Sequence, residues 1–303
     1  MIVRWGLDDL EPLLAELFID RPLLVASRRW DDSGLPSAAR WTEIPSHRIA
    51  VPGDVDGILA AGGGSSIDTA KAASAASGLQ LVSVPTTYSG AEWTDFFGVR
   101  DPGKRMVGGG SGARLAGIVY EPRLTLDLPR PASGGTAMNA LAHCVEALYP
   151  GDLESARRGV ALIVEWLPRV LENLRDLDAR THLLEGAGAA GEALATHGLY
   201  LGHAMAQAIG GAYGLPHGAL NAICLPAAMR FNADVAPLAL AVCPVETAEE
   251  LARLAGFTRL GELGVPEDDL PALAAATAAR PGARRNPRPA SPAEIEELLR
   301  SVW

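Results

Sequence analysis

Short apolar runs alternate with helical patterns along the first part of the chain. Residues 7–18 and 62–77 have the spacing of helices, and the second of these segments opens on a run of glycines. Apolar runs of strand length lie at 22–27, 47–51, 56–61 and 79–85 and at the start of 115–129. Strands that alternate with helices are typical of a parallel sheet covered by helices. We therefore predict a parallel α/β domain over residues 1–128.

After about residue 128 the apolar positions change to a helical period. Segments with this spacing are 136–149, 161–177 and 249–263. The Pro-rich end of the chain predicts a loop followed by a last helix, with Ser291 as its N-cap and Pro292 as its first residue. The pattern predicts an all-helical domain over residues 129–303.

The segment 193–229 contains no Lys, Arg, Asp or Glu. It is long enough to span a membrane, but glycines, prolines and three histidines interrupt its apolar residues. A spanning helix needs an unbroken apolar run, which is missing here. Buried helices that line a site are the better interpretation, and we predict no membrane span.

Composition narrows the class of partner. The chain has 303 residues, 48% of them hydrophobic, and a net charge of −10, which argues against nucleic acid or an anionic membrane as partner. Three scattered cysteines form no CxxC pair, so no disulfide framework or thiolate zinc site is predicted. The first residues lack the apolar core of a signal peptide. We expect a cytoplasmic protein that acts on a small molecule, and a homodimer is an open option.

Two turns follow neighbouring predicted strands and carry phosphate-binding chemistry. The first, "GGGSSID" at 62–68, opens a helix, where backbone N–H groups and the helix dipole attract an anion. The second, "PTTYSG" at 85–90, adds two threonine hydroxyls. Turns at the carboxyl ends of parallel strands share one edge of the sheet. The sequence predicts a nucleotide site there, although the alternative of ordinary tight turns stays open.

Five motifs occur in a fixed order and carry a family resemblance. They are "GGGSSIDTAK", "PTTYSGAEW", "MNALAHCVEALY", "HAMAQ…GLPHGALNAICLP" and "NPRP". Their order resembles that of the iron-containing alcohol dehydrogenase superfamily, and within it the maleylacetate reductases, over about residues 57–232. The resemblance implies a dehydroquinate synthase-like fold, in which a dinucleotide-binding α/β domain, shortened here, precedes an all-α domain. It also implies an NADH- or NADPH-dependent oxidoreductase whose active site lies between the two domains.

The resemblance assigns residues to the site. The cofactor positions fall on Gly63, Gly64, Ser65, Asp68, Thr86, Thr87 and Tyr88. The metal positions of the metal-dependent members fall on Asn139, His143, His203 and His217. Residues 139 and 143 are neighbours on one helix face. We expect His203 to lie on one helix and His217 at the start of the next.

Two positions depart from the metal-dependent pattern. Asn139 stands where those members have Asp, and a neutral amide is a weaker ligand for a divalent cation. Gln207 stands where the family has a histidine, and glutamine cannot act as an acid or base near neutral pH. We therefore expect no bound iron or zinc; if one binds, His143, His203 and His217 are its ligands. Otherwise the histidines bind a substrate oxygen, one of them donating a proton near its ordinary pKa, and Gln207 orients the substrate.

The choice of cofactor rests on one weak signal. The first predicted strand ends in Ser27-Arg28-Arg29, without the acidic residue that prefers a free ribose 2′-hydroxyl. The two arginines favour NADPH slightly, with solvated surface charges as the alternative. A basic residue at Lys104 or Arg105 is not assigned to the site.

Three functions are compatible with these residues. The first is NAD(P)H-dependent reduction of a small carbonyl or enol-acid substrate, in which the catalytic residues are His143, His203, His217, Asn139 and Gln207. The second is a lyase, cyclase or isomerase reaction on the same fold, which the departures at residues 139 and 207 favour. The third is a non-catalytic derivative of the family. The retained glycine turn and histidines argue for the first.

Overall fold

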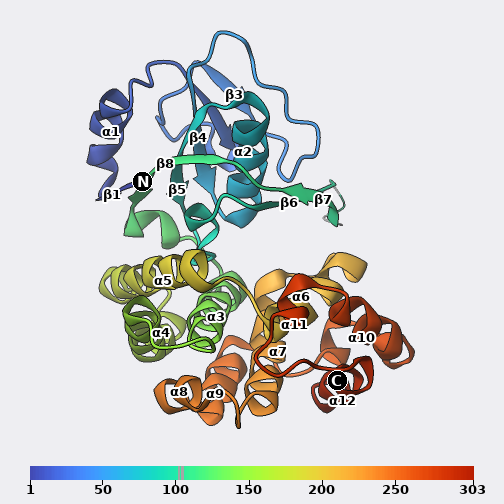
Figure 1. The fold of residues 1–303 in the computed structure, drawn as a ribbon. Coiled ribbons are helices and arrows are strands. Elements are labelled where there is room, and N and C mark those ends of the chain that lie inside the picture. Colours follow the sequence, from blue (N-terminus) through green and yellow to red (C-terminus); the bar gives the residue numbers. More distant parts are fainter. Residues whose placement is uncertain (102, 104–105) are drawn as a thin grey trace. The chain divides into compact units, whose positions relative to one another are not determined.

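The structure is a computed structural model that describes residues 1–101, 103 and 106–303. Lys104 and Arg105 lie outside the described residues. Contacts within the chain divide it into two compact units, Met1–Thr125 and Leu126–Trp303. Each unit is described by itself, with the elements labelled in Figure 1.

Unit 1 is built on a six-stranded parallel sheet. Its strands are β1 (Ile2–Trp5), β2 (Pro22–Ala26), β3 (Ala39–Trp41), β4 (Gly57–Gly62), β5 (Gln80–Pro85) and β8 (Arg114–Tyr120). They lie in the order β1-β8-β5-β4-β2-β3. Because β4 and β5 are paired in parallel, their carboxyl ends meet at one edge of the sheet.

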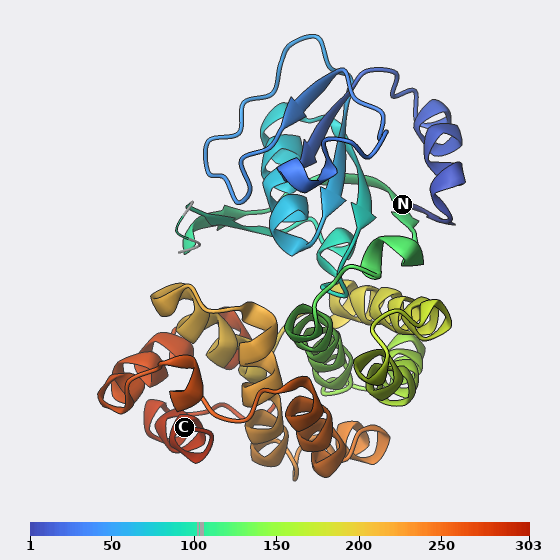
Figure 2. The same ribbon diagram turned by 180° about the vertical axis from the view of Figure 1, so that it is seen from behind.

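Side chains that alternate along the strands bury both faces of the sheet. Leu24 and Leu59 pack on the side of α1 (Leu10–Glu16), and Leu23 and Ile58 pack on the side of α2 (Gly64–Ser77). Figures 1 and 2 show the two helices on opposite sides of the sheet. The predicted parallel α/β unit is confirmed.

The sequence pattern misplaced some strands. Residues 47–51 are not a strand, because Ile49 and Val51 pack against the α2 side of the core without pairing to a neighbour. The pattern missed the short strands β1 and β3, and also the antiparallel hairpin of β6 (Phe97–Arg100) and β7 (Met106–Gly110), whose glycines carry no apolar signal.

Unit 2 is helical, as predicted. Its helices are α3 (Arg130–Ala147), α4 (Glu154–Glu172), α5 (Leu177–His197), α6 (Leu201–Tyr213), α7 (His217–Phe231), α8 (Pro237–Val242), α9 (Val245–Ala255), α10 (Leu270–Ala278), α11 (Pro281–Arg284) and α12 (Pro292–Ser301). Short 3₁₀ helices lie in unit 1 at Leu7–Asp9, Arg28–Trp30, Ala91–Trp93 and Pro122–Thr125, and in unit 2 at Gly261–Leu263 and Glu267–Asp269. The helix predicted over 249–263 is therefore too long, because α9 ends at Ala255. The predicted N-cap of α12 is confirmed, since Ser291 and Glu294 form a reciprocal capping box.

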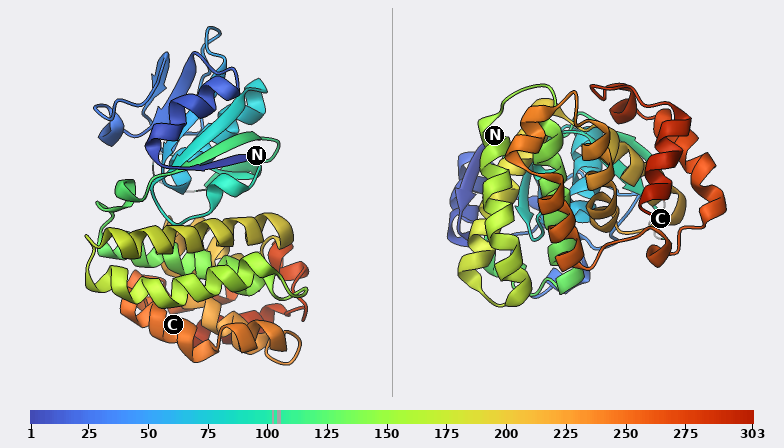
Figure 3. Two further views of the ribbon diagram at one scale, coloured as in Figure 1. Left: turned by 90° about the vertical axis from the view of Figure 1, so that its left-hand side faces the viewer. Right: turned by 90° about the horizontal axis from the view of Figure 1, so that it is seen from below.

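Helix α3 is the centre of unit 2. It packs against α4, α5, α7 and α9, and most of its side chains are buried all round. Figure 3 shows α4 and α5 lying side by side, in agreement with their extensive packing. Helices α3 and α7 approach each other most closely at Gly135 and Gly218, where a Cβ on Gly218 would lie 2.3 Å from the Gly135 carbonyl oxygen.

The uncharged segment 193–229 forms the end of α5, all of α6 and most of α7. Gly198 and Gly214, both with positive φ, end α5 and α6 and so break the segment into separate helices. Among the described residues, none of the helices combines the length and the apolar character needed to cross a membrane.

Candidate functional site

The glycine turn of unit 1 leads directly from β4 into α2. Gly62 has φ +140°, which favours glycine, and Gly63 caps the helix without a side-chain hydrogen bond. The first N–H groups of a helix have no partner within it, and the helix dipole adds partial positive charge at the same place. The turn therefore offers backbone donors to an anion such as a pyrophosphate.

The second turn lies against the first, as the strand pairing requires. The Thr86 N–H donates to the Gly62 carbonyl oxygen at 3.0 Å, and a Cβ on Gly63 would lie only 2.8 Å from Thr87 Cγ2. Within the described part of the chain, the buried Thr87 Oγ1 has no hydrogen-bond partner. Tyr88 is completely buried, whereas Ser65 is exposed on the first turn of α2. Thr87 and Ser65 are therefore the hydroxyls with capacity for a ligand.

Asp68 makes contacts within unit 1. Its carboxylate pairs with Lys71 Nζ at 3.2 Å and accepts a hydrogen bond from the Gly98 N–H at 3.3 Å. Lys71 is buried and also donates to Thr94 Oγ1 and the Phe96 carbonyl. These bonds hold α2 against the segment that begins the β6–β7 hairpin. A contact of Asp68 with a cofactor stays a prediction.

Unit 2 brings the three predicted histidines together. His143 lies on α3, His203 on α6, and α7 begins at His217. The rings of His143 and His203 are stacked with centroids 4.7 Å apart, and the centroids of His203 and His217 are 5.7 Å apart. The side chains of His143 and His203 are buried. The cluster is therefore a compact imidazole site inside the helical unit.

Glu146 completes the cluster, and the sequence did not identify it. Its carboxylate accepts from His203 Nδ1 at 2.8 Å and from the backbone N–H groups of His203 and Tyr200 at 3.1 and 2.7 Å. Glu146 and His203 are both fully buried. The only signal for it in the sequence is its place three residues after His143 in "HCVE". The bond to Nδ1 fixes the His203 ring so that Nε2 faces away from Glu146.

Two asparagines bind the other histidines. The Asn221 side-chain NH₂ donates to Asn139 Oδ1 at 2.7 Å and to His217 Nε2 at 3.0 Å. Asn139 Nδ2 lies 3.4 Å from His143 Nε2. Asn221 was not predicted from the sequence, although it lies one helical turn after His217.

We expected one of the three histidines to donate a proton near its ordinary pKa, and the environment of His143 does not suit that function. Burial, and then the neighbouring His203 and His217, hold the pKa of His143 well below its usual value of 6.5. His143 is therefore neutral at physiological pH and is not the proton donor. Among the described residues, its Nδ1 and the Nε2 of His203 are buried nitrogens without a hydrogen-bond partner.

Gln207 lies one turn after His203 on α6 and contacts a residue that the sequence did not identify. Its side-chain oxygen accepts from Arg280 Nη1 at 3.4 Å, and its backbone carbonyl accepts from Arg280 Nη2 at 3.1 Å. Gln207 therefore connects the histidine face of α6 to a cation.

The remaining histidines have structural contacts, in agreement with their lack of an assigned function. His182 stacks on Trp166 and contacts Glu185, and His197 Nδ1 lies 2.6 Å from the Ala147 carbonyl oxygen.

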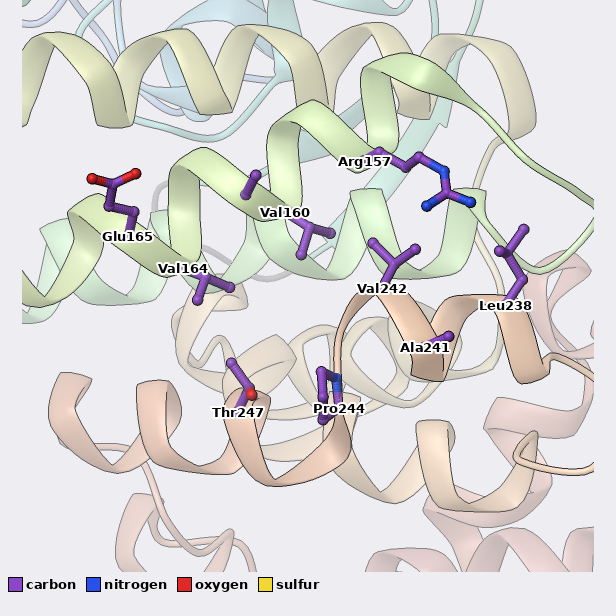
Figure 4. Close-up of a pocket in the computed structure, with 10 residues that line it drawn as sticks. Arg157, Val160, Val164, Glu165, Leu238, Ala241, Val242, Pro244 and Thr247 are labelled. Atoms are coloured by element: carbon purple, nitrogen blue, oxygen red, sulfur yellow. The ribbon is translucent and has the colours of Figure 1, made fainter.

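A cavity of about 520 Å³ lies apart from the histidine cluster, between α4, α8 and α9 (Figure 4). Val160, Val164, Leu238 and Val242 form much of its wall. None of the predicted site residues lines this cavity. It is therefore not the place where the histidines bind a substrate.

Two family models match the chain. The model described as "Fe-containing alcohol dehydrogenase family, C-terminal" covers residues 134–303, and the model described as "Iron-containing alcohol dehydrogenase" covers residues 47–117. Together they include the glycine turn, the second turn and the whole histidine cluster.

Individual relatives agree with the family models. The chain is 36% identical over 237 residues to a maleylacetate reductase of Pseudomonas knackmussii, covering 74% of this chain and 67% of the relative. It is 33% identical over 312 residues to maleylacetate reductase 1 of Rhodococcus opacus, covering 98% of this chain and 84% of the relative. The crystal structure of maleylacetate reductase from Agrobacterium tumefaciens superposes with a TM-score of 0.86 at 25% identity, covering 100% of this chain and 95% of the other.

Proposed function

The chain belongs to the iron-containing alcohol dehydrogenase family and is an NAD(P)-dependent oxidoreductase, and we propose that it reduces a small oxo acid or its enol form. The observation that carries this proposal is the buried His143, His203 and His217 cluster, in which Glu146 holds His203 with its Nε2 available. Similarity to maleylacetate reductases supports a substrate of this class. We assign residues 1–128 to the cofactor and 129–303 to the substrate.

The glycine turn fits a dinucleotide. The N–H groups at the start of α2 would hold the pyrophosphate, with Gly63 and Gly64 leaving room for it and Thr87 and Ser65 adding hydroxyl donors. When bound, the nicotinamide supplies the hydride. Tyr88 is completely buried, so we do not assign it a contact with the cofactor.

The histidine cluster provides the proton and the polar contacts. Nδ1–H of His203 is held by Glu146, so the doubly protonated ring would give its Nε2 proton to the substrate oxygen and return to the neutral Nδ1–H form. Neutral His143 stacks on His203 with Asn139 beside it, both uncharged polar groups, and Asn221 holds the Asn139 amide in place. The location of the reaction between the two units remains a prediction from the resemblance.

The residues at the former metal positions do not fit a divalent cation. The amide oxygen that stands in place of the carboxylate, Asn139 Oδ1, accepts a hydrogen bond from Asn221, which also donates to His217 Nε2. The Nε2 of His143 faces the Asn139 amide group. The carboxylate of Glu146 binds the far side of His203. Among the described residues, no group of three or more His, Cys, Asp or Glu side chains could hold a metal ion. We propose a metal-independent enzyme, although the family name points to iron.

The proposal is tested on protein purified without chelator and again after chelator treatment. We expect oxidation of NADPH or NADH with a panel of short oxo acids, maleylacetate among them, at equal rates in both samples and with sub-stoichiometric iron and zinc by elemental analysis. The physical reason is that the Asn221 amide occupies Asn139 Oδ1 and His217 Nε2, two of the four atoms that would have to bind the metal. Stoichiometric metal that is lost together with activity on chelation would contradict metal independence. Absence of any NAD(P)H oxidation would contradict the reductase.

Family membership does not favour the other two functions. A lyase, cyclase or isomerase was supported by the departures at Asn139 and Gln207, but the matched relatives named here are reductases. A non-catalytic derivative is opposed by the complete histidine cluster and its buried Glu146.

We propose a preference for NADPH because two arginines follow the end of β2. Ala26 of β2 pairs with Ala61 of β4, so Arg28 and Arg29 follow β2 at the sheet edge where the glycine turn begins. Both arginines are exposed, and the Arg29 guanidinium lies 5.1 Å from the Trp30 ring centroid. This position suits a ribose 2′-phosphate.

The double substitution Arg28→Ala with Arg29→Ala tests this preference. We expect the Kd of NADPH to rise about tenfold (~1.4 kcal/mol) while the Kd of NADH is unchanged, because only NADPH carries the 2′-phosphate. Fluorescence titration of both cofactors measures it. Arg21→Ala is the matched control, since Arg21 precedes β2 at its opposite end and pairs with Asp54. If the affinities for NADPH and NADH fell equally, Arg28 and Arg29 would be ordinary solvated surface charges and would not bind the 2′-phosphate.

A further inference from the structure

Arg280 is a partly buried cation without an acidic partner. Its Nη1 and Nη2 donate only to the side-chain and backbone oxygens of Gln207, and Nε is buried with no hydrogen-bond partner among the described residues. No ion pair with Arg280 is formed in the part of the chain that the structure describes. Burial lowers the pKa of the guanidinium, although arginine stays charged at neutral pH.

The environment of Arg280 differs from that of Arg180, the fully buried arginine of unit 2, whose guanidinium donates to Ser133 Oγ and to the Leu128 and Leu174 carbonyl oxygens. Arg288 and Arg300, which are more exposed, pair with carboxylates, Arg288 with Glu294 and Arg300 with Glu267. Arg280 has five N–H donors, and the two oxygens of Gln207 satisfy only part of them. A buried positive charge is costly unless an anion or several acceptors compensate it. An anion from outside the chain would supply the missing acceptor and compensate this charge.

The position of Arg280 relates that anion to the histidine cluster. The guanidinium lies along the row of α6 formed by His203, Gln207 and Gly211, because it binds Gln207 and its Nη2 would lie 3.6 Å from a Cβ on Gly211. Residues four apart on a helix share one face. The cation is thus about one helical turn (~6 Å) further along α6 than His203.

We infer that Arg280 is a subsite for a carboxylate of the substrate, with Gln207 holding the guanidinium in place. An arginine presents paired N–H groups that match the two oxygens of a carboxylate. A short oxo acid can then place its carbonyl oxygen at His203 Nε2 and its carboxylate at Arg280. This inference rests on the proposed reductase and narrows its substrates to carbonyl compounds that carry a carboxylate at about this distance. It also gives Gln207 a positioning function that requires no proton transfer.

If Arg280 only stabilises the fold and binds no substrate, a different result is expected. The same bonds to Gln207 connect the start of α11 to α6, so their loss would lower thermal stability. A structural tether would not distinguish a carboxylate from a neutral ligand. The test therefore measures whether the effect of the substitution depends on the charge of the ligand. The melting temperature of each variant is measured as well.

The experiment compares Arg280→Gln with the matched control Arg284→Gln on the full chain. Arg284 is exposed on the same short helix, four residues later, so the control removes one charge without reaching α6. Calorimetric titration with succinate in the presence of NADPH measures carboxylate binding without turnover. We expect the Kd of succinate to rise about 10- to 100-fold in Arg280→Gln and to stay unchanged in Arg284→Gln.

A second measurement uses turnover. In Arg280→Gln, the KM of an oxo acid should rise by a similar factor, whereas the KM of its methyl ester and the Kd of NADPH should stay at the values of the unchanged chain. The carboxylate subsite would be overturned if Arg280→Gln bound succinate with the affinity of the chain without substitutions. It would also be overturned if the chain without substitutions bound no succinate. If the chain binds succinate through Arg280 but oxidises no NAD(P)H, the reductase fails and the carboxylate subsite stands.

Discussion

The substitution Glu146→Gln is expected to lower kcat for oxo-acid reduction by roughly 100-fold, with little change in the Kd of NADPH. Glutamine keeps the shape of Glu146 but removes the negative charge that accepts three hydrogen bonds from His203 and Tyr200. Its NH₂ group would face N–H donors, so His203 loses the partner that fixes its ring and tautomer. Steady-state kinetics over a range of pH, together with cofactor titration, measure the effect.

Two further variants distinguish an effect of Glu146 on the orientation of His203 from an effect on the folding of the chain. Glu146→Asp keeps the charge on a shorter side chain and should recover part of kcat. Glu185→Gln is the matched control, because Glu185 contacts His182 on partly exposed α5 positions that have no contact with the cluster, and its kcat should not change. If a folded Glu146→Gln enzyme keeps full kcat and an unaltered pH profile, Glu146 does not position His203 for catalysis.

The substitution Gly64→Val should weaken binding of NADPH and NADH tenfold or more, which is over ~1.4 kcal/mol. A Cβ on Gly64 would lie 3.4 Å from Ser89 Oγ and 3.9 Å from Ala91 Cβ, both ordinary contacts, so α2 can still form. The branched side chain would instead occupy the space in front of the helix N-terminus where the pyrophosphate must lie. Fluorescence titration with both cofactors measures the loss.

The control for this prediction is Gly53→Val, since Gly53 is exposed and a Cβ there meets nothing within 4 Å. It should bind both cofactors as the unchanged chain does. Gly63→Ala is less informative, because its Cβ would collide with Thr87 and disturb the packing of the two turns. A folded Gly64→Val protein with unaltered affinity for both cofactors would remove the pyrophosphate from this turn.

Local patterns predicted the parts of the fold that depend on neighbouring residues in the sequence. The glycine turn between β4 and α2, the positions of Asn139 and His143 on one helix, and the cap of α12 all follow from spacing over a few residues. The strand predicted at 47–51 fails because apolar residues can be buried by packing alone. Edge strands such as β1 give a weak signal, since only some of their side chains reach the core.

The candidate site was predicted only in part, because its remaining members meet across helices. Glu146 contacts His203 across 57 positions, and Asn221 contacts Asn139 across 82. Arg280 is one of four arginines between residues 280 and 288, and nothing in their order shows which of them is shielded from water. Such contacts depend on how α3, α6 and α7 pack together, and the spacing of residues along the sequence does not show that packing.

The contact between Gly135 and Gly218 has a consequence for how this protein can change. Asn139 lies one turn after Gly135, and Asn221 lies within one turn of Gly218, so the backbone contact sets how far apart the two amides are held. Even one methyl group at Gly218 would separate the helices and lengthen the bond between those amides. Mutational variation near the histidine cluster is thus limited at Gly218, a residue outside the cluster itself. Attempts to alter the chemistry of the cluster by design should treat Gly218 as fixed.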